Sequence, residues 1–335
     1  MNRDLKKIIS QMTLEEKAGM CSGLDFWHLK SVERLGIPEV MVSDGPHGLR
    51  KQDDKGDHLG MNDSIKAVCF PPAALSACSF DRSLMEAMGE TIGREAQAND
   101  VSVVLGPAVN IKRSPLCGRN FEYYSECGVL SGLTAAAEVS GATENGLICY
   151  VKHFAFNDQD NYRQNNICTW LNEQSAREIY LKPFEMCMKL DDITLNYVEK
   201  QADGNYQNAE TTIPAAMGVM TAFNRIGATW TGGSYALITG ILRTEWGFNG
   251  AVITDNANTG VFMLGQQMIE AGADMKLTYD TSAARWDNYD ANDPETYHYA
   301  REALHHVLYT TANTKAMNHA MPGSVYKDGP QIATV

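Results

Sequence analysis

Charged side chains stand at or just beyond the ends of several short apolar runs, where buried strands would end. Asp44, Lys152, His153 and Asp255 all occupy such positions. Hydrolysis of an acetal with retention needs a carboxylate that attacks the anomeric carbon and an acid that protonates the leaving oxygen. Asp255 is a good candidate for the attacking carboxylate, because an apolar strand would fix its backbone. Lysine and histidine can donate hydrogen bonds to sugar hydroxyl groups, and aspartate can accept them.

Asp255 also has a purely structural alternative. Aspartate is a favoured N-cap residue, so its carboxylate could begin the helix that follows the strand. Position in the sequence does not separate capping from catalysis, and both roles stay open at this point.

The charged side chains can meet only if the runs before them are neighbouring strands of one sheet. The candidate strands are short and apolar, as strands buried on both faces should be. They lie at residues 39–42, 101–105, 147–151, 217–221 and 251–254, with a weaker one at 274–277. Helix-like stretches lie at 84–99, 130–144, 173–190, 235–245 and 297–310. The alternation and the length predict an α/β fold, a (β/α)8 TIM-like barrel with allowance for irregular or missing strands.

Two segments interrupt this alternation. Residues 191–214 are polar with little apolar periodicity, which indicates a long surface insertion in a barrel domain of residues 1–312. Residues 313–335 contain no further βα unit. We interpret them as a C-terminal tail or the start of a linker to a missing second domain.

The composition is that of an ordinary globular protein, with 44% hydrophobic and 21% charged residues. A formal net charge of −13 opposes binding to nucleic acid. No apolar run reaches membrane-spanning length, and the first residues lack the apolar region of a signal peptide, so we expect a cytoplasmic protein without a membrane partner. The eight cysteines show no metal-binding spacing, and we expect no metal or organic cofactor.

About six segments, in chain order, resemble the motifs of glycoside hydrolase family 3. The most specific is WGFNGAVITD at 246–255, which is similar to the segment that ends in the family's nucleophilic aspartate. The others are SDGPHGLR at 43–50, LGP at 105–107 with GRNFE at 118–122, KHFAFN at 152–157, REIY at 177–180 with PFE at 183–185, and MTAFN at 220–224. So many ordered matches exceed a chance hit to one short pattern.

The resemblance implies the members of the site. Asp255 would be the nucleophile that forms a glycosyl-enzyme intermediate. The substrate-binding positions would be Asp44, Arg119, Lys152, His153, Arg163, Met220, Phe223 and Asn256. Three of these residues also have structural alternatives, namely pairing of Arg119 with Glu122, pairing of Arg163 with Asp158 or Asp160, and a core position for His153.

Several departures from the family bear on activity. Phe223 stands where the family has a tyrosine, and Asn256 stands where an aromatic sugar platform is common. The acid/base of β-glucosidase-type members comes from an α/β-sandwich domain, which residues 313–335 are too few to form. The histidine that serves the single-domain N-acetylglucosaminidases has no counterpart in 156–160, which disfavours that activity. We therefore expect this chain to lack the acid/base.

The predicted function is a retaining exo-β-glycosidase, a β-glucosidase-like glycoside hydrolase of carbohydrate metabolism that acts on terminal β-D-glucosyl residues. Glucose is the first choice of sugar because the charged side chains can together reach every hydroxyl of a pyranose. A β-xylosidase is one alternative, and a catalytically weak or inactive sugar-binding protein is another. Beside the glucoside or oligosaccharide substrate, the partners considered are a separate or missing α/β-sandwich domain and a homo-oligomer.

Overall fold

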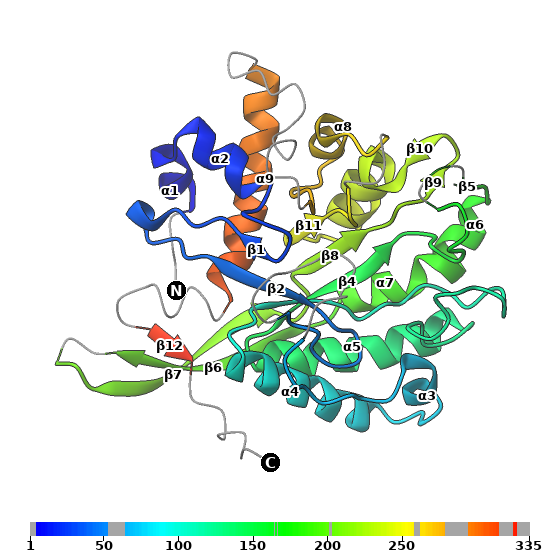
Figure 1. Cartoon of the computed structure of the whole chain (residues 1–335), viewed down its shortest axis with the longest axis horizontal. Coiled ribbons are helices and arrows are strands. Elements are labelled where there is room, and N and C mark those ends of the chain that lie inside the picture. Colours follow the sequence, from blue (N-terminus) through cyan, green and yellow to red (C-terminus); the bar gives the residue numbers. More distant parts are fainter. Residues whose placement is uncertain are drawn as a thin grey trace.

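A curled, mostly parallel sheet forms the centre of the molecule (Figure 1). The computed structural model describes residues 5–52, 64–163, 165, 167–200, 203–257, 262–278, 294–314 and 324–326. In spatial order the strands are β1 (His28–Leu29), β2 (Val40–Asp44), β3 (Val103–Leu105), β4 (Ile148–Phe154), β8 (Gly218–Thr221) and β11 (Ala251–Ile253). All neighbours are parallel except β1, which is antiparallel to β2.

The sheet continues beyond β11 towards the N-terminal segment. Met275 forms a parallel bridge with Ile253, and the Lys276 amide donates to the Cys21 carbonyl at 3.0 Å. These pairings curl the sheet into an irregular TIM-like barrel, so the predicted fold class is confirmed. Five of the predicted strands overlap β2, β3, β4, β8 and β11, and the weaker one supplies the bridge.

Two long helices, α4 (Arg82–Ala98) and α5 (Gly128–Glu144), pack against each other with their backbones close together. A Cβ atom at Gly89 would collide with the Glu138 carbonyl, and one at Gly141 would collide with the Glu86 carbonyl. Glycine is therefore required at this crossing. The remaining elements of this part are α3 (Ala73–Ala77), α6 (Glu173–Ser175), α7 (Lys182–Met188) and α8 (Gly265–Glu270), with π-helical turns at Ala176–Tyr180 and Ala236–Glu245 and 3₁₀ turns at Glu33–Leu35 and Thr231–Gly233.

Three further helices lie together on another side of the sheet (Figure 1): α1 (Leu5–Gln11), α2 (Leu14–Met20) and α9 (Pro294–Ala312). A buried polar contact ties α9 to the sheet. His306 Nδ1 lies 2.9 Å from Asp274 Oδ1, and Asp274 Oδ2 accepts a hydrogen bond from the Val252 amide at 2.7 Å. The fully buried Asp274 thus joins α9 to the strand that precedes Asp255.

The segment predicted as a surface insertion is a regular β-hairpin that projects from the body (Figure 1). Its strands are β6 (Asp192–Lys200) and β7 (Tyr206–Pro214), paired in register over their whole length. Leu195 and Ile213 are buried, each with 3% of its surface exposed. β12 (Ser324–Tyr326), from the segment predicted as a tail, pairs antiparallel with β6. Backbone pairing, which apolar periodicity does not report, gives this segment its structure.

A second small sheet lies beyond the carboxyl ends of β4 and β8. Its strands are β5 (Cys168–Thr169), β9 (Arg225–Ile226) and β10 (Thr229–Trp230). The Asn224 side chain donates to the Ala155 carbonyl at 3.0 Å and so joins the β8–β9 connection to the chain after β4. This sheet supports one rim of the barrel's carboxyl-terminal face.

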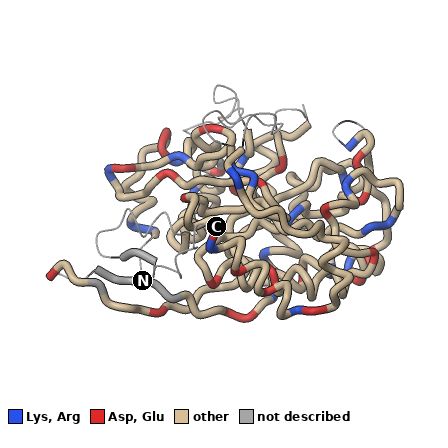
Figure 2. Tube along the Cα trace, turned by 60° about the horizontal axis from the view of Figure 1, so that its bottom comes forward, with Lys and Arg blue, Asp and Glu red and all other residues tan. Residues whose placement is uncertain are grey.

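Acidic and basic residues are interspersed along the chain in Figure 2. The formal net charge of −13 is therefore spread over several elements. None of the described helices is long and apolar enough to cross a membrane.

Candidate active site

The carboxyl ends of β2, β4 and β11 bring four of the predicted site residues together. Asp44 ends β2, Lys152 and His153 lie in β4, and Asp255 follows two residues after β11. Lys152 Nζ donates to Asp44 Oδ1 at 2.8 Å, and His153 Nε2 lies 3.7 Å from Asp255 Oδ2. Parallel strands end at the same edge of a sheet, and this geometry accounts for the convergence.

The two oxygens of Asp255 have different surroundings. Oδ1 accepts a hydrogen bond from the Asn256 amide at 2.8 Å. Oδ2 is buried, and it makes no hydrogen bond to any described residue. The helix α8 begins at Gly265 with Leu264 as its N-cap, so Asp255 does not cap it. One oxygen is therefore fixed by the backbone, while the other is open to a bound molecule.

Arg163 is the cation that faces Asp255. Its Nη1 lies 3.6 Å from Asp255 Oδ2, and its Nε is 3.0 Å from Asp160 Oδ1. The guanidinium also lies 4.5 Å from the centre of the Phe223 ring, a distance typical of a cation–π contact. Asp160 and Phe223 thus hold Arg163 in place from two sides.

His153 is neutral in this arrangement. Burial, with the Arg119, Lys152 and Arg163 cations, lowers the pKa of His153 well below its usual value. Arg119 Nη2 lies 3.1 Å from His153 Nε2, and a guanidinium can only donate, so Nε2 is the acceptor. The ring proton then sits on Nδ1, which is 3.5 Å from Tyr123 Oη. His153 consequently turns a lone pair, not a proton, towards Asp255.

An ion pair with the buried Lys152 holds Asp44 at the end of β2. Burial by itself raises the pKa of Asp44, but the Lys152 ammonium and the Arg50 guanidinium outweigh it and hold that pKa below its usual value. Arg50 Nη1 is 3.7 Å from Asp44 Oδ2. Each carboxylate oxygen has two acceptor positions, so Asp44 can still accept hydrogen bonds from a sugar.

Three buried polar residues support His153 from behind. Asn110 Oδ1 accepts from the His153 amide at 2.8 Å, and Asn110 Nδ2 donates to the His153 carbonyl at 2.9 Å. Asn157 Nδ2 donates to Tyr123 Oη at 2.9 Å, and Tyr123 Oη donates to the Asn157 carbonyl at 3.1 Å. The backbone of β4 is therefore fixed where its side chains enter the site.

The two arginines of the site also form ion pairs with neighbouring carboxylates, as their structural alternatives predicted. Arg119 forms a close ion pair with Glu122 and lies 3.4 Å from Asp160. Asp158, in contrast, accepts from the Ile111 amide at 3.2 Å, and burial raises its pKa to about 7. Glu122 pairs with Arg119, and Asp160 lies within reach of both Arg119 and Arg163. Within the described residues, neither is left as a proton donor.

The remaining predicted positions differ in how they border the site. Met220 lies within β8 and is paired in register with Ile253, and its side chain is buried. Phe223 is buried under Arg163. Asn256 is partly exposed, and its backbone amide donates to Asp255 Oδ1.

His47 was not among the predicted site residues. Both ring nitrogens of His47 are buried without a hydrogen-bond partner among the described residues. Burial and the nearby Lys152 lower its pKa, whereas Asp44 acts in the opposite direction. A histidine three residues after the strand-end Asp44 was the available signal, but sequence alone does not tell where its ring points.

A family model described as "Glycosyl hydrolase family 3 N terminal domain" matches residues 29–292. This chain belongs to glycosyl hydrolase family 3. The match spans every site residue from Asp44 to Asn256, and it confirms the resemblance seen in the motifs. It covers the N-terminal domain of the glycosyl hydrolase family 3 proteins, which is the part that this barrel represents.

Relatives in glycosyl hydrolase family 3 are much longer. The thermostable beta-glucosidase B of Acetivibrio thermocellus is 44% identical over 274 residues, which are 82% of this chain and 33% of the relative. An exo-alpha-(1->6)-L-arabinopyranosidase of Bifidobacterium longum is 38% identical over 248 residues, 74% of this chain and 30% of that protein. A beta-glucosidase structure from Kluyveromyces marxianus in complex with glucose superposes with a TM-score of 0.78 and 30% identity, over 93% of this chain and 34% of that one. The chain spans about a third of the length of these proteins.

Proposed function

We propose that this chain forms the sugar-binding and nucleophile-bearing part of a retaining exo-β-glycosidase that acts on terminal β-D-glucosyl residues. The observation that carries the proposal is the state of Asp255 Oδ2. This oxygen is buried, lacks a hydrogen bond to the described residues, and lies 3.6 Å from a guanidinium. Such an oxygen has its lone pairs open for attack on an electrophilic carbon.

The residues around Asp255 suit a two-step displacement. Asp255 Oδ2 attacks the anomeric carbon while the bond to the leaving oxygen breaks, and its electron pair stays with that oxygen. Water then attacks the same carbon and gives up a proton to the solvent, the bond between that carbon and Asp255 breaks, and the original configuration is restored. Asp44 and Lys152 supply an acceptor and a donor for the sugar hydroxyls, and Arg119 supplies further donors.

No side chain of the described residues is assigned the role of the proton donor. General acid catalysis is worth about 10²- to 10⁴-fold in rate. We propose that an α/β-sandwich domain supplies the acid, either on the same polypeptide or on a separate chain. In this scheme residues 1–312 form the barrel and residues 313–335 lead towards that domain. The chain's coverage of only about a third of its relatives supports the scheme.

Two observations support testing the alternative functions, a pentopyranosidase and a sugar-binding protein. One relative is named as an arabinopyranosidase, and its sugar is a pentopyranose, which has no exocyclic carbon. This supports testing β-xylosides and α-L-arabinopyranosides as substrates. Phe223 lacks a hydroxyl group, and Asn256 has no aromatic ring on which a sugar could stack. Both differences are compatible with a protein that binds a sugar without hydrolysing it.

Leaving-group dependence tests this proposal. We expect the pure chain to release dinitrophenolate from 2,4-dinitrophenyl β-D-glucoside, because this leaving group needs no protonation, and to cleave cellobiose at least about 10²-fold more slowly. Equally efficient cleavage of the dinitrophenyl glucoside and of cellobiose would contradict the proposal that this chain lacks the acid. No dinitrophenolate release above that of Asp255→Ala would favour the sugar-binding alternative. Comparing the cleavage rates of the dinitrophenyl glycosides of glucose, xylose and arabinopyranose identifies the preferred sugar.

A further inference from the structure

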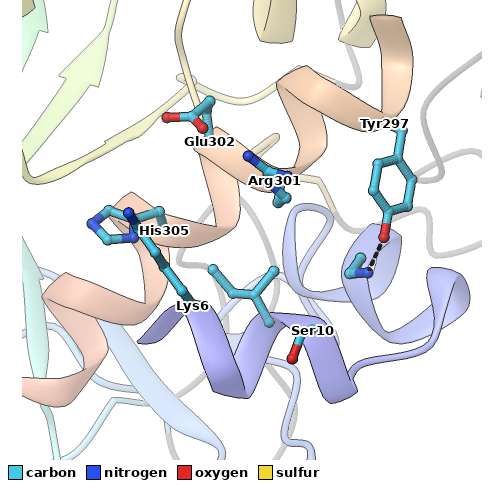
Figure 3. Close-up of a pocket in the computed structure, with 8 residues that line it drawn as sticks. Lys6, Ser10, Tyr297, Arg301, Glu302 and His305 are labelled. Atoms are coloured by element: carbon cyan, nitrogen blue, oxygen red, sulfur yellow. Dashed lines mark hydrogen bonds between the residues drawn. The ribbon is translucent and has the colours of Figure 1, made fainter. Parts of the chain in front are cut away.

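A cavity between α1, α2 and α9 gathers basic side chains (Figure 3). It has a volume of about 480 Å³, and none of its lining residues belongs to the active site. Among the described residues, the charged side chains that line it are Lys6, Lys17, Arg301 and one carboxylate, Glu302, with His305 and Tyr297 beside them. In a chain with a formal net charge of −13, this cavity therefore has the opposite sign.

Lys17 is the most constrained of these groups. Only 3% of its surface is exposed. Its Nζ donates to Tyr297 Oη at 2.9 Å and lies 4.7 Å from the centre of the same ring. Within the described residues it forms no ion pair with a carboxylate. A buried ammonium is costly unless an opposite charge compensates it, and a neutral phenol compensates it only in part.

The other two cations of the cavity, Lys6 and Arg301, are also free to bind an anion. Neither Lys6 nor Arg301 forms an ion pair with a described carboxylate, and both side chains extend into the space drawn in Figure 3. Arg301 lies one helical turn after Tyr297 on α9, so both face the same cavity. Two ammonium groups and one guanidinium thus surround a space that holds one acidic side chain.

We propose that this cavity binds the phosphoryl group of a small phosphate monoester. Arginine matches the geometry of phosphate oxygens through two parallel hydrogen bonds, and lysines act as point charges towards the same group. The cavity is larger than a phosphate ion, and Ile9 and the Tyr297 ring provide apolar surface for the ester carbon chain. The site is independent of the proposed glycosidase function.

Binding there would link three helices that are distant in the sequence. The bound phosphate contacts Lys6 on α1, Lys17 on α2 and Arg301 on α9. A ligand that binds the folded state and not the unfolded state raises the melting temperature in proportion to the logarithm of its concentration. The expected signature is therefore a saturable stabilisation that differs from general salt screening.

The test measures the melting temperature of the full chain in sodium phosphate and in sodium chloride at equal ionic strength, and then in glycerol 3-phosphate beside glycerol. Glycerol is the control for binding of the polyol portion at the sugar site. We expect both phosphates, and neither control, to stabilise the protein, with dissociation constants confirmed by calorimetry. A response to inorganic phosphate without one to glycerol 3-phosphate would overturn the assignment of a monoester.

Three variants separate a built site from a general charge effect. Lys17→Met and Arg301→Gln should weaken phosphate binding at least tenfold. Lys7→Gln removes the same charge from α1 outside the cavity and should bind phosphate as the parent chain does. Arg301 is exposed, so its replacement should leave folding intact even where Lys17→Met does not. Equal phosphate responses in Arg301→Gln and Lys7→Gln, or no saturable response in the parent chain, would overturn the proposal.

Discussion

Arg163 and Asp255 face each other with Nη1 and Oδ2 3.6 Å apart, and neither atom has a hydrogen bond to a described residue. The pair is therefore close enough for electrostatic attraction but too far apart for a hydrogen bond. The lone pairs of Asp255 Oδ2 therefore stay open for a carbon atom, while Asp160 and Phe223 hold Arg163 in place.

Replacement of Arg163 tests its part in catalysis. Arg163→Gln removes the charge that faces Asp255, and we expect the rate constant for dinitrophenyl glucoside cleavage to fall about 10²-fold, as for loss of other preorganised groups. Arg177→Gln is the matched control, because Arg177 pairs with Glu173 and Glu245 on the exterior. A rate within twofold of the parent for Arg163→Gln would contradict the assigned role.

The protonation of His153 can be observed directly. Because its pKa lies well below the usual value, we expect the ring to stay neutral with its proton on Nδ1 from pH 5 to pH 8. Heteronuclear NMR of ¹⁵N-labelled histidine distinguishes this tautomer from the charged ring. Protonation of His153 with a midpoint near 6.5 would contradict the tautomer assignment.

Glu138 makes stability depend on pH. Full burial raises its pKa from 4.5 to about 8, although the hydrogen bond from Tyr124 acts in the opposite direction. The folded state therefore holds a proton that the unfolded state has lost between these values, so the free energy of unfolding should fall as pH rises from about 4.5 to 8. Urea denaturation of Glu138→Gln should show a shallower fall over this interval. An unchanged slope would exclude Glu138 as its source.

The α4–α5 crossing tolerates no side chain at Gly89. A Cβ there meets the Glu138 carbonyl, so Gly89→Ala should lower the free energy of unfolding by about 1–3 kcal/mol, in the range of overpacking. Gly118 has nothing within 4 Å of the corresponding position, which makes Gly118→Ala the matched control. Equal stabilities of the two variants would show that the helices separate at little cost.

The sequence predicted the parts of the fold that depend on burial. Strands such as residues 251–254 were visible as apolar runs because both of their faces are covered. The β6–β7 hairpin was predicted only as a polar insertion. Among its described side chains the buried apolar ones are Leu195 and Ile213, and its pairing is a backbone property. The exact bounds of β4 also extend through His153 to Phe154, further than its apolar run.

The convergence of Asp44, Lys152, His153 and Asp255 followed from the common direction of parallel strands. The tautomer of His153 could not be predicted in this way, because it depends on Arg119 approaching from a different loop. The orphaned ring of His47 likewise depends on side-chain direction. The cytoplasmic location and the absence of a cofactor stay predictions.

Trapping of the glycosyl-enzyme intermediate tests the central claim most directly. The full chain would be incubated with 2,4-dinitrophenyl 2-deoxy-2-fluoro-β-D-glucoside, which slows release of the sugar, and then weighed by intact-protein mass spectrometry beside Asp255→Asn. We predict a mass gain of one fluoroglucosyl group, located on Asp255 by peptide mapping and absent from the variant. No mass gain, or a gain that persists in Asp255→Asn, would contradict Asp255 as the nucleophile.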